Sequence, residues 1–285
     1  MSLYITAREY RESSTGQDTL NLIGGGNQAD QDAELERRIW NASGWIDNTC
    51  NSSLIAASHV ETRSVSLSSR GRLAFSPNHV HLNQLTGVAL GSDGSSLSAV
   101  SASTIAAAWI EEQTFMVPLA AGAFSTSIQF GPRVRGRFLS KLTYVAGWPN
   151  TTITSAPTAG ATSFTVANPA GLVPMVGSDI ADEQVRIIDG GETEVITIVG
   201  VSGNTVTCSA LANAHEAGAT LTMLPGPVKQ AAIDVTSAFL RARSSDALTI
   251  GQTLVAGGGG ATGDSVRWKL LRDAEAMLRP FARKR

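Results

Sequence analysis

His79 and His81 are the residues whose type and spacing come nearest to a metal site. They stand two positions apart in NHVHL, so a strand there would place both imidazoles on one face, where they could begin such a site. No third ligand stands at a suitable spacing, and His59 and His215 lend no support, because His215 lies in another predicted module. We therefore expect no metal at this pair.

Phosphate loops and catalytic groups have no convincing motif in the sequence. GGGN at 24–27 and GGGG at 257–260 are not followed by Lys-Ser or Lys-Thr, which favours flexible loops over phosphate binding. No G-x-S-x-G elbow occurs, and the 4 histidines are too scattered to assign a catalytic triad. We expect no enzymatic activity and no cofactor.

Acidic residues gather between positions 179 and 194. Their spacing is not that of an EF-hand, so we expect a solvated face in preference to a calcium site. These residues are Asp179, Asp182, Glu183, Asp189, Glu192 and Glu194.

Arginines at alternate positions form the first of two basic features. On a strand, Arg133, Arg135 and Arg137 of GPRVRGRF would align their guanidinium groups on one face. That face can be a solvated one, or it can meet phosphates or carboxylates, either in a DNA channel or against another subunit.

The C-terminal end is the second basic feature. Cations near a helix C-terminus stabilise the helix itself, so only the excess in FARKR argues for an acidic partner or DNA. The candidate docking residues are Arg279, Phe281, Arg283, Lys284 and Arg285.

Bulk composition limits what these features can mean. A chain of 285 residues with a formal net charge of −2 allows two or three modules and gives no global sign of nucleic-acid binding. Cys50 and Cys208 are far apart and fit a reduced compartment, where both would be packed free thiols. The sequence has no signal-peptide pattern and no long apolar run, so we expect a soluble protein that is not exported and does not contact membranes.

A helix is predicted to follow Asp30 or Asp32, either of which can cap it. Its apolar residues recur at intervals of four, three and four and form one face. They are Leu35, Ile39, Ala42 and Ile46.

Trp40 and Trp45 lie outside the centre of that face, so this helix should pack against more than one neighbour. Two interpretations stay open. Both rings, with Ile39 and Ile46, can complete one intrachain core, or they can lie at a subunit interface, where tryptophan is enriched.

Two more helices are predicted near the C-terminus. The first has Pro227 in its first turn and ends near Ser244. The second follows a glycine-rich stretch at 251–263 and can be capped by Asp264 or Ser265. Its apolar seam would be Val266, Leu270, Ala274, Met277 and Phe281.

Alternating apolar and polar residues predict strands between the helices. Period-two runs fill about 60–148 and 151–224, and DGGE and SGN are hairpin signals in the second run. The predicted fold class is α+β, a small helical core interrupted by a large β-rich insertion. We expect an N-terminal arm and first core helix at 1–55, two β modules at 56–149 and 150–224, and the C-terminal core helices at 225–285.

Several stretches resemble one protein family. The opening YITAREY, the pattern I-x-x-A-S-x-W-I-D-x-x-C-N from Ile39 to Asn51, and the later PGPVKQAAIDVTSAFLRAR are similar to head-to-tail adaptor proteins of long-tailed DNA bacteriophages. Residues 150–224, with the ending Ala-His-x-x-Gly-Ala from Ala214 to Ala219, resemble a small β module found in phage structural proteins. The simplest adaptors are shorter and nearly all helical, and residues 60–148 match no module that we can name.

The resemblance implies a mechanical role. Such adaptors form a homo-oligomeric ring, here expected to be a dodecamer, beneath the portal protein; the ring joins the capsid to the next neck or tail component and lets double-stranded DNA pass with transient, non-specific contact. The protein would be made in the host cytoplasm and reside in the neck of the virion. Trp40 and Trp45 would fasten the first helix within the core and against neighbouring subunits. The last helix or FARKR would dock on the portal, with 251–263 ordered on assembly.

A carbohydrate-binding or adhesive β protein is the alternative from a different class. Two β modules rich in Ser, Thr and Gly are common in receptor-binding proteins, and sugar sites need exposed aromatic rings for stacking. Trp109, Trp148 and Tyr144 are the candidates.

Overall fold

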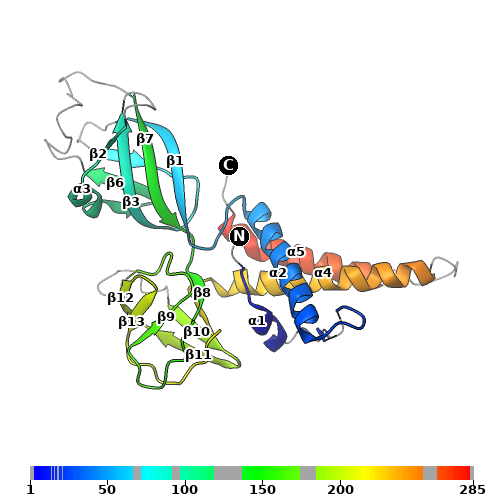
Figure 1. Ribbon diagram of the computed structural model, residues 1–285. Coiled ribbons are helices and arrows are strands. Elements are labelled where there is room, and N and C mark those ends of the chain that lie inside the picture. Colours follow the sequence, from blue (N-terminus) through cyan, green and yellow to red (C-terminus); the bar gives the residue numbers. More distant parts are fainter. Residues whose placement is uncertain are drawn as a thin grey trace, which may run out of the picture. The chain divides into compact units, whose positions relative to one another are not determined.

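The computed structural model describes residues 3–13, 15, 17, 19–20, 22–66, 72–91, 97–118, 137–173, 184–252 and 262–282 (Figure 1). The chain forms two units. Unit 1 comprises Met1–Ile55, Asn150–Pro169 and Pro174–Arg285, and unit 2 comprises Ala56–Pro149 and Ala170–Val173. Helices from both ends of the chain pack together, and four antiparallel sheets lie between them in sequence, which confirms the predicted α+β class.

Capping boxes fix where the two N-terminal helices start. Thr6 caps α1 (Ala7–Glu12) and Asn27 caps α2 (Gln28–Cys50). The Asn27 side chain accepts the N–H of Asp30, and the Asp30 carboxylate accepts the N–H of Asn27. The prediction that Asp30 or Asp32 is the cap is therefore wrong, because Asn27 can start the helix earlier with Asp30 as its capping-box partner.

The apolar face of α2 is the predicted one. Its residues are each at most 1% exposed: Leu35, Ile39, Ala42 and Ile46. The helix packs against α1, α4 and α5 within unit 1, so the expectation of more than one neighbour is confirmed.

The C-terminal helices α4 (Gly226–Gln252) and α5 (Thr262–Leu278) are packed together (Figure 1). Pro227 lies in the first turn of α4, as predicted. The predicted end near Ser244 is wrong, because packing against α5 sustains a helix that periodicity alone does not favour. Asp264 and Ser265 lie inside α5 and do not cap it, since α5 already begins at Thr262.

The buried side of α5 differs in part from the predicted seam. Ala274 and Leu278 are fully buried, whereas Val266 is 39% exposed. Phe281 lies beyond α5 in the short 3-10 helix η1 (Arg279–Phe281). The seam was misassigned because the chain leaves the α-helix at Leu278, so the spacing of the helix does not continue to Phe281.

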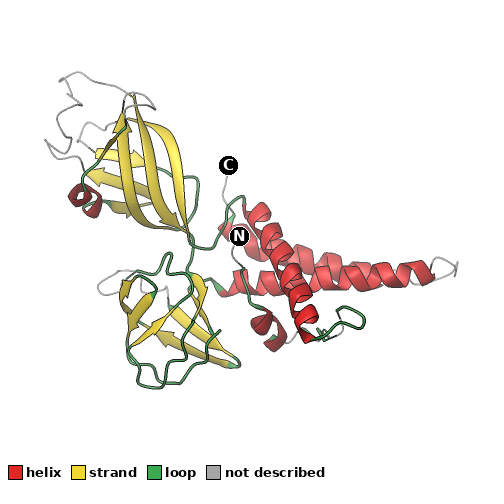
Figure 2. Cartoon of the chain, in the orientation of Figure 1, coloured by secondary structure: helices red, strands yellow, loops and turns green. Residues whose placement is uncertain are grey.

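The β part of unit 1 contains two antiparallel sheets, whose strands are yellow in Figure 2. Their strand orders are β11-β10-β14-β8 and β12-β13-β9. Pairing of β14 with β8 joins the two ends of this β segment, 150–222. Gly190–Gly191 and Gly203–Asn204 form the two tight hairpin turns, as DGGE and SGN predicted. The strands are β8 (Asn150–Thr152), β9 (Ser163–Thr165), β10 (Val185–Asp189), β11 (Glu192–Ile196), β12 (Ile198–Ser202), β13 (Thr205–Cys208) and β14 (Thr220–Thr222).

Unit 2 contains the other two antiparallel sheets, with orders β1-β7-β3-β4 and β2-β6-β5, around an apolar core that includes Phe75, Phe115 and Leu142. Its strands are β1 (Ala57–Ser66), β2 (Arg72–Phe75), β3 (Leu82–Gly91), β4 (Ser98–Ala99), β5 (Trp109–Glu111), β6 (Thr114–Pro118) and β7 (Arg137–Ala146). Unit 2 also contains the short helix α3 (Ala102–Ala106), in a region where only strands were predicted. Ser101 starts this helix by accepting the N–H of Thr104.

Both cysteines are buried free thiols in unit 1, as predicted. Burial is the main cause that raises the pKa of the Cys50 thiol to about 12, and nearby Asp47 adds to it. Neither thiol has the lowered pKa of a reactive cysteine. Within the part of the chain that the structure describes, no helix combines the length and apolarity needed to cross a membrane.

Candidate assembly interface

The solvent side of α2 carries the main candidate surface. Ile39 and Ile46 are fully buried, but Trp40 keeps 51% of its surface exposed. Beside it lies a groove of about 900 Å3, which we name the Trp40 groove. Its lining includes Arg38, Trp40, Trp45, Asp47, Phe239 and Arg267. Trp40 therefore does not complete the apolar core of its own chain.

The charged groups around the Trp40 groove differ in whether they have a hydrogen-bond or ion-pair partner among the described residues. Arg38 binds Glu34, with Nε 2.9 Å from Oε1. Asp47 accepts a hydrogen bond of 2.5 Å from the Tyr4 hydroxyl, and burial raises the pKa of its carboxyl. The Nε of Arg267 is buried and has no hydrogen-bond partner among the described residues.

The N-terminal arm, residues 3–12, bonds to the helices α2 and α4 of unit 1. Tyr4 is fully buried, and its hydroxyl, besides donating to Asp47, accepts the N–H of Leu54 at 2.9 Å. Glu9 pairs with Lys229 of α4 in a largely buried ion pair. The arm thus joins α2 to α4, and it was missed as an ordered element although Thr6 and Glu9 form a readable capping box.

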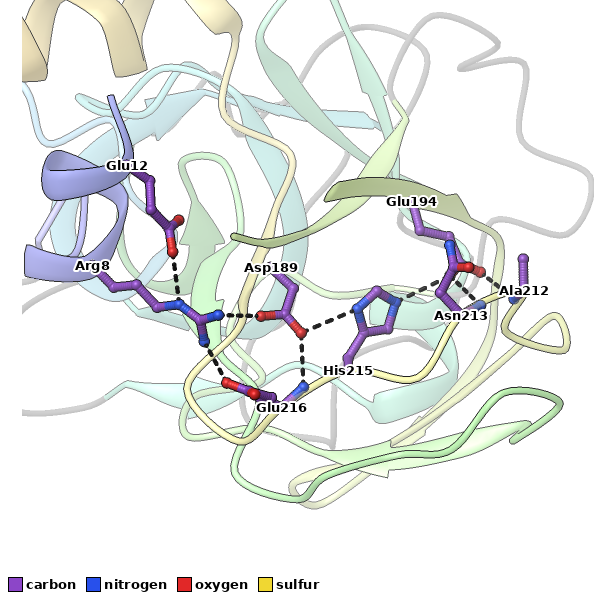
Figure 3. A network of polar contacts seen from close by, with 8 residues as sticks. All are labelled: Arg8, Glu12, Asp189, Glu194, Ala212, Asn213, His215 and Glu216. Carbon is purple, nitrogen blue, oxygen red and sulfur yellow. Dashed lines mark hydrogen bonds and ion pairs between the residues drawn. The ribbon is translucent and has the colours of Figure 1, made fainter. Parts of the chain in front are cut away.

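The arm also reaches the β part of unit 1 through Arg8 (Figure 3). Arg8 Nη2 lies 2.8 Å from Asp189 Oδ1, and Nη1 lies 3.2 Å from Glu216 Oε2. The same guanidinium binds Glu12 on α1 at 2.9 Å. Three carboxylates therefore hold one arginine, which ties the arm to β10 and to the loop before β14.

His215 continues this network inward. Its side chain is 0% exposed, with Nε2 3.0 Å from Glu194 Oε2 and Nδ1 3.5 Å from Asp189 Oδ2 (Figure 3). Glu194 also accepts the N–H groups of Ala212 and Asn213, at 2.6 and 3.0 Å. Burial raises the pKa of Glu194, but these two N–H groups and His215 outweigh it, so the pKa lies below its ordinary value.

Asp189 and Glu194 correct the prediction of a solvated acidic face. Both side chains are only 9% exposed, because they face His215. Strand alternation contains the missed signal: Glu194 shares the buried face of β11 with Ile196, while Val195 between them is 53% exposed. An acidic residue on a buried face requires a polar partner. Asp179, Asp182 and Glu183 lie outside the described residues.

The Ala-His-x-x-Gly-Ala ending now has a structural explanation. His215 supplies the buried imidazole, Gly218 takes a φ of 96°, and Ala219 is 1% exposed. The Gly218 N–H donates to the Ile153 carbonyl at 2.7 Å, which holds the loop against the residue that follows β8. The motif therefore closes the β part of unit 1 and need not be a reaction centre.

In unit 2, the other histidines are stacked on aromatic rings. His79 stacks on His59 with ring centroids 3.5 Å apart, and its Nδ1 lies 2.7 Å from the Tyr144 hydroxyl. His81 stacks on Trp148 at 4.2 Å, and burial lowers its pKa to about 4. The expectation that His79 and His81 share one face of a strand is wrong, because both precede β3 in a bend.

Unit 2 also has a groove of about 610 Å3 between α3, β3 and β5. Trp109, 37% exposed, lines it together with Gln84 and Thr86. Of the other aromatic candidates for sugar stacking, Tyr144 is fully buried and Trp148 is covered on one face by His81. Only Trp109 of these three candidates therefore remains in a groove.

The predicted basic sites lie mostly outside the described residues. Arg133, Arg135, Arg283, Lys284 and Arg285 are not described, and Arg137 is described only as the first residue of β7.

Arg279 is exposed and Phe281 is half-buried, both in η1. Among the described residues, no group of three or more His, Cys, Asp or Glu side chains is arranged to hold a metal ion.

No protein-family model, curated protein or solved structure matches the chain.

Proposed function

We propose that the chain is a structural subunit of a head-to-tail adaptor ring in a long-tailed double-stranded DNA bacteriophage. The ring would join the capsid to the tail beneath the portal and let DNA pass. The protein would act mechanically, without a cofactor and without membrane contact, in the neck of the virion.

One observation carries the proposal: the separate stretches that resemble adaptors bond to one another in unit 1. Tyr4 of YITAREY donates to Asp47 of the Trp-Ile-Asp pattern. Glu9 of the same arm pairs with Lys229 of the later helix, at the start of PGPVKQAAID. Stretches that are distant in sequence therefore form one helical core, which supports reading them as parts of a single family pattern.

Trp40 supports an assembly role for this core. A half-exposed tryptophan beside a groove is costly to leave in water and is typical of the centre of a protein interface. In a ring, each subunit would cover the Trp40 groove of its neighbour, so that the same contact repeats around the axis.

The test is mass by light scattering with negative-stain imaging, on the purified protein alone and mixed with portal-containing particles. We expect annular density at the portal vertex, and loss of it in Trp40→Ala. Trp109→Ala is the matched control, since it removes an exposed tryptophan from unit 2. The proposal would be contradicted if the protein did not bind portal-containing particles, or if Trp40→Ala and Trp109→Ala gave the same density.

Docking on the portal is assigned to the C-terminal end, with Arg279, Phe281, Arg283, Lys284 and Arg285. Deleting residues 280–285 should reduce incorporation into portal-containing particles while the ring still forms. Unchanged incorporation would exclude this end as the docking element.

The groove of unit 2 favours one second candidate function, carbohydrate binding. Trp109 offers an aromatic face beside the amide of Gln84 and the hydroxyl of Thr86, a combination suited to sugars. A glycan array tests it directly: binding that is lost in Trp109→Ala supports this function, and an array without signal removes it.

A further inference from the structure

We propose that the Trp40 groove receives a polypeptide segment that carries a large apolar side chain next to a carboxylate. This inference rests on the proposed function, because it names the chemistry of the partner at the same surface.

The walls fit a large apolar side chain. Trp40, Trp45 and Phe239 line a groove of about 900 Å3 and come from two different helices, α2 and α4. The apolar residues on the other side of α2 are already buried, so the Trp40 groove is the part of α2 where further apolar burial can occur. Aromatic walls of this kind bind partner side chains at the centre of interfaces.

Among the described residues that line the groove, Arg267 is the cation without an ion pair. Its guanidinium lies 5.8 Å from the ring of Trp268, but this contact provides no acceptor for an N–H group. Arg267 lines the groove, makes no ion pair among the described residues, and its Nε has no hydrogen-bond partner there, so an anion in the groove would meet an unpaired guanidinium. Arg38, the other guanidinium at the groove, already binds Glu34.

A carboxylate fits this arrangement better than a nucleic acid does. Strand binding needs a row of cations to neutralise successive phosphates. The Trp40 groove instead places one guanidinium that has no ion pair among the described residues, Arg267, beside apolar rings. Charge complementarity therefore selects a single anionic group beside an apolar one, as an Asp or Glu next to an aromatic or aliphatic residue supplies.

The experiment compares two synthetic peptides, acetyl-Gly-Phe-Asp-Gly-amide and its Asn counterpart, by isothermal titration into the full-length protein. We expect the Asp peptide to bind roughly tenfold more tightly, the usual gain from a hydrogen bond to a charged group. The preference should vanish in Arg267→Gln and persist in part in Arg267→Lys. Arg272→Gln, an exposed arginine of the same helix, is the matched control and should keep it.

Trp40→Ala should weaken both peptides equally, because it removes apolar burial and leaves the charge. Circular dichroism of each variant confirms that it is folded. Equal binding of the two peptides, no binding of either, or a preference that survives Arg267→Gln would overturn the inference. The inference would also be overturned if a short oligothymidylate displaced the Asp peptide at a concentration below that of the peptide. A protein that forms rings on portal particles yet fails these titrations contradicts only the inference, not the proposed function.

Discussion

The β part of unit 1 and the β-rich unit 2 use histidine in opposite ways. In unit 1, His215 lies between the carboxylates of Asp189 and Glu194. In unit 2, His59 and His81 lie against aromatic rings, and burial lowers the pKa of both imidazoles. The surroundings of His215 supply carboxylate acceptors, whereas those of His59 and His81 disfavour a charge on the ring.

We therefore expect the two regions to unfold under different conditions. Polar contacts with buried carboxylates make the β part of unit 1 sensitive to loss of His215, because Asp189 and Glu194 would stay buried without it. Stacked neutral imidazoles make unit 2 sensitive to protons.

Removal of the His215 side chain should have the largest effect. We expect His215→Ala to lower the free energy of unfolding of the β part of unit 1 by about 4 kcal/mol, since Glu194 and Asp189 lose their buried partner. Hydrogen exchange of amides in β10, β11 and β14 during a urea titration measures it. His59→Ala is the control and should destabilise only unit 2; a loss shared by both units would break the contrast.

Acid should be the next largest effect, and it should act on unit 2. The pKa of His81 is about 4 in the folded protein against 6.5 for the ordinary value, so the folded state binds fewer protons than the unfolded state. The stability that neutral His81 contributes to unit 2 is therefore fully present above pH 6.5. This contribution declines by roughly 3 kcal/mol as the pH falls to about 4. Unfolding midpoints of unit 2 recorded at a series of pH values test this.

Two comparisons control the acid prediction. His81→Gln should flatten the pH dependence of unit 2. Glu194 in unit 1 has a lowered pKa, so its contribution is present above pH 4.5 and declines only as the pH falls through the still lower folded value. If the β part of unit 1 weakens first on acidification, the contrast between the two regions is wrong.

A smaller effect is expected at the loop that closes the β part of unit 1. Gly218→Ala forces a side chain onto a backbone with φ of 96°, at a cost of about 1–2 kcal/mol, although no atom obstructs a Cβ there. Gly191→Ala is the matched control, because Gly191 also has open space but no positive φ. Thermal denaturation of both variants gives the difference, and equal melting temperatures would show that Gly218 is not strained.

The smallest effect should come from Arg8, at the solvent end of the His215 network. The Arg8 side chain is 39% exposed, so Arg8→Ala should cost about 1 kcal/mol or less in global stability. Its main consequence should be faster hydrogen exchange of α1, because the arm loses its contacts with Asp189 and Glu216. Arg11→Ala removes a pair to Asp32 on α2 and should leave the contact of α1 with the β part unchanged.

Local sequence patterns were sufficient to predict features that depend on residues close together in the chain. The buried face of α2, the two glycine hairpins and the packed thiols were predictable, because burial at regular intervals and turn chemistry act over a few residues. Asp189 and Glu194 were predicted to be solvated, but both side chains face the buried His215, which is distant from them in sequence.

By itself, the sequence determined the α+β class, the apolar stripe of α2 and the turns of the β segment, since these depend on contacts between near neighbours in the chain. Tertiary structure alone decided the length of α4, the docking of the arm on Asp47, Lys229 and Asp189, and the exposure of Trp40. Each of these depends on which distant groups come together. The free energy of a buried charge or a long helix is set by those partners, and one chain segment does not contain them.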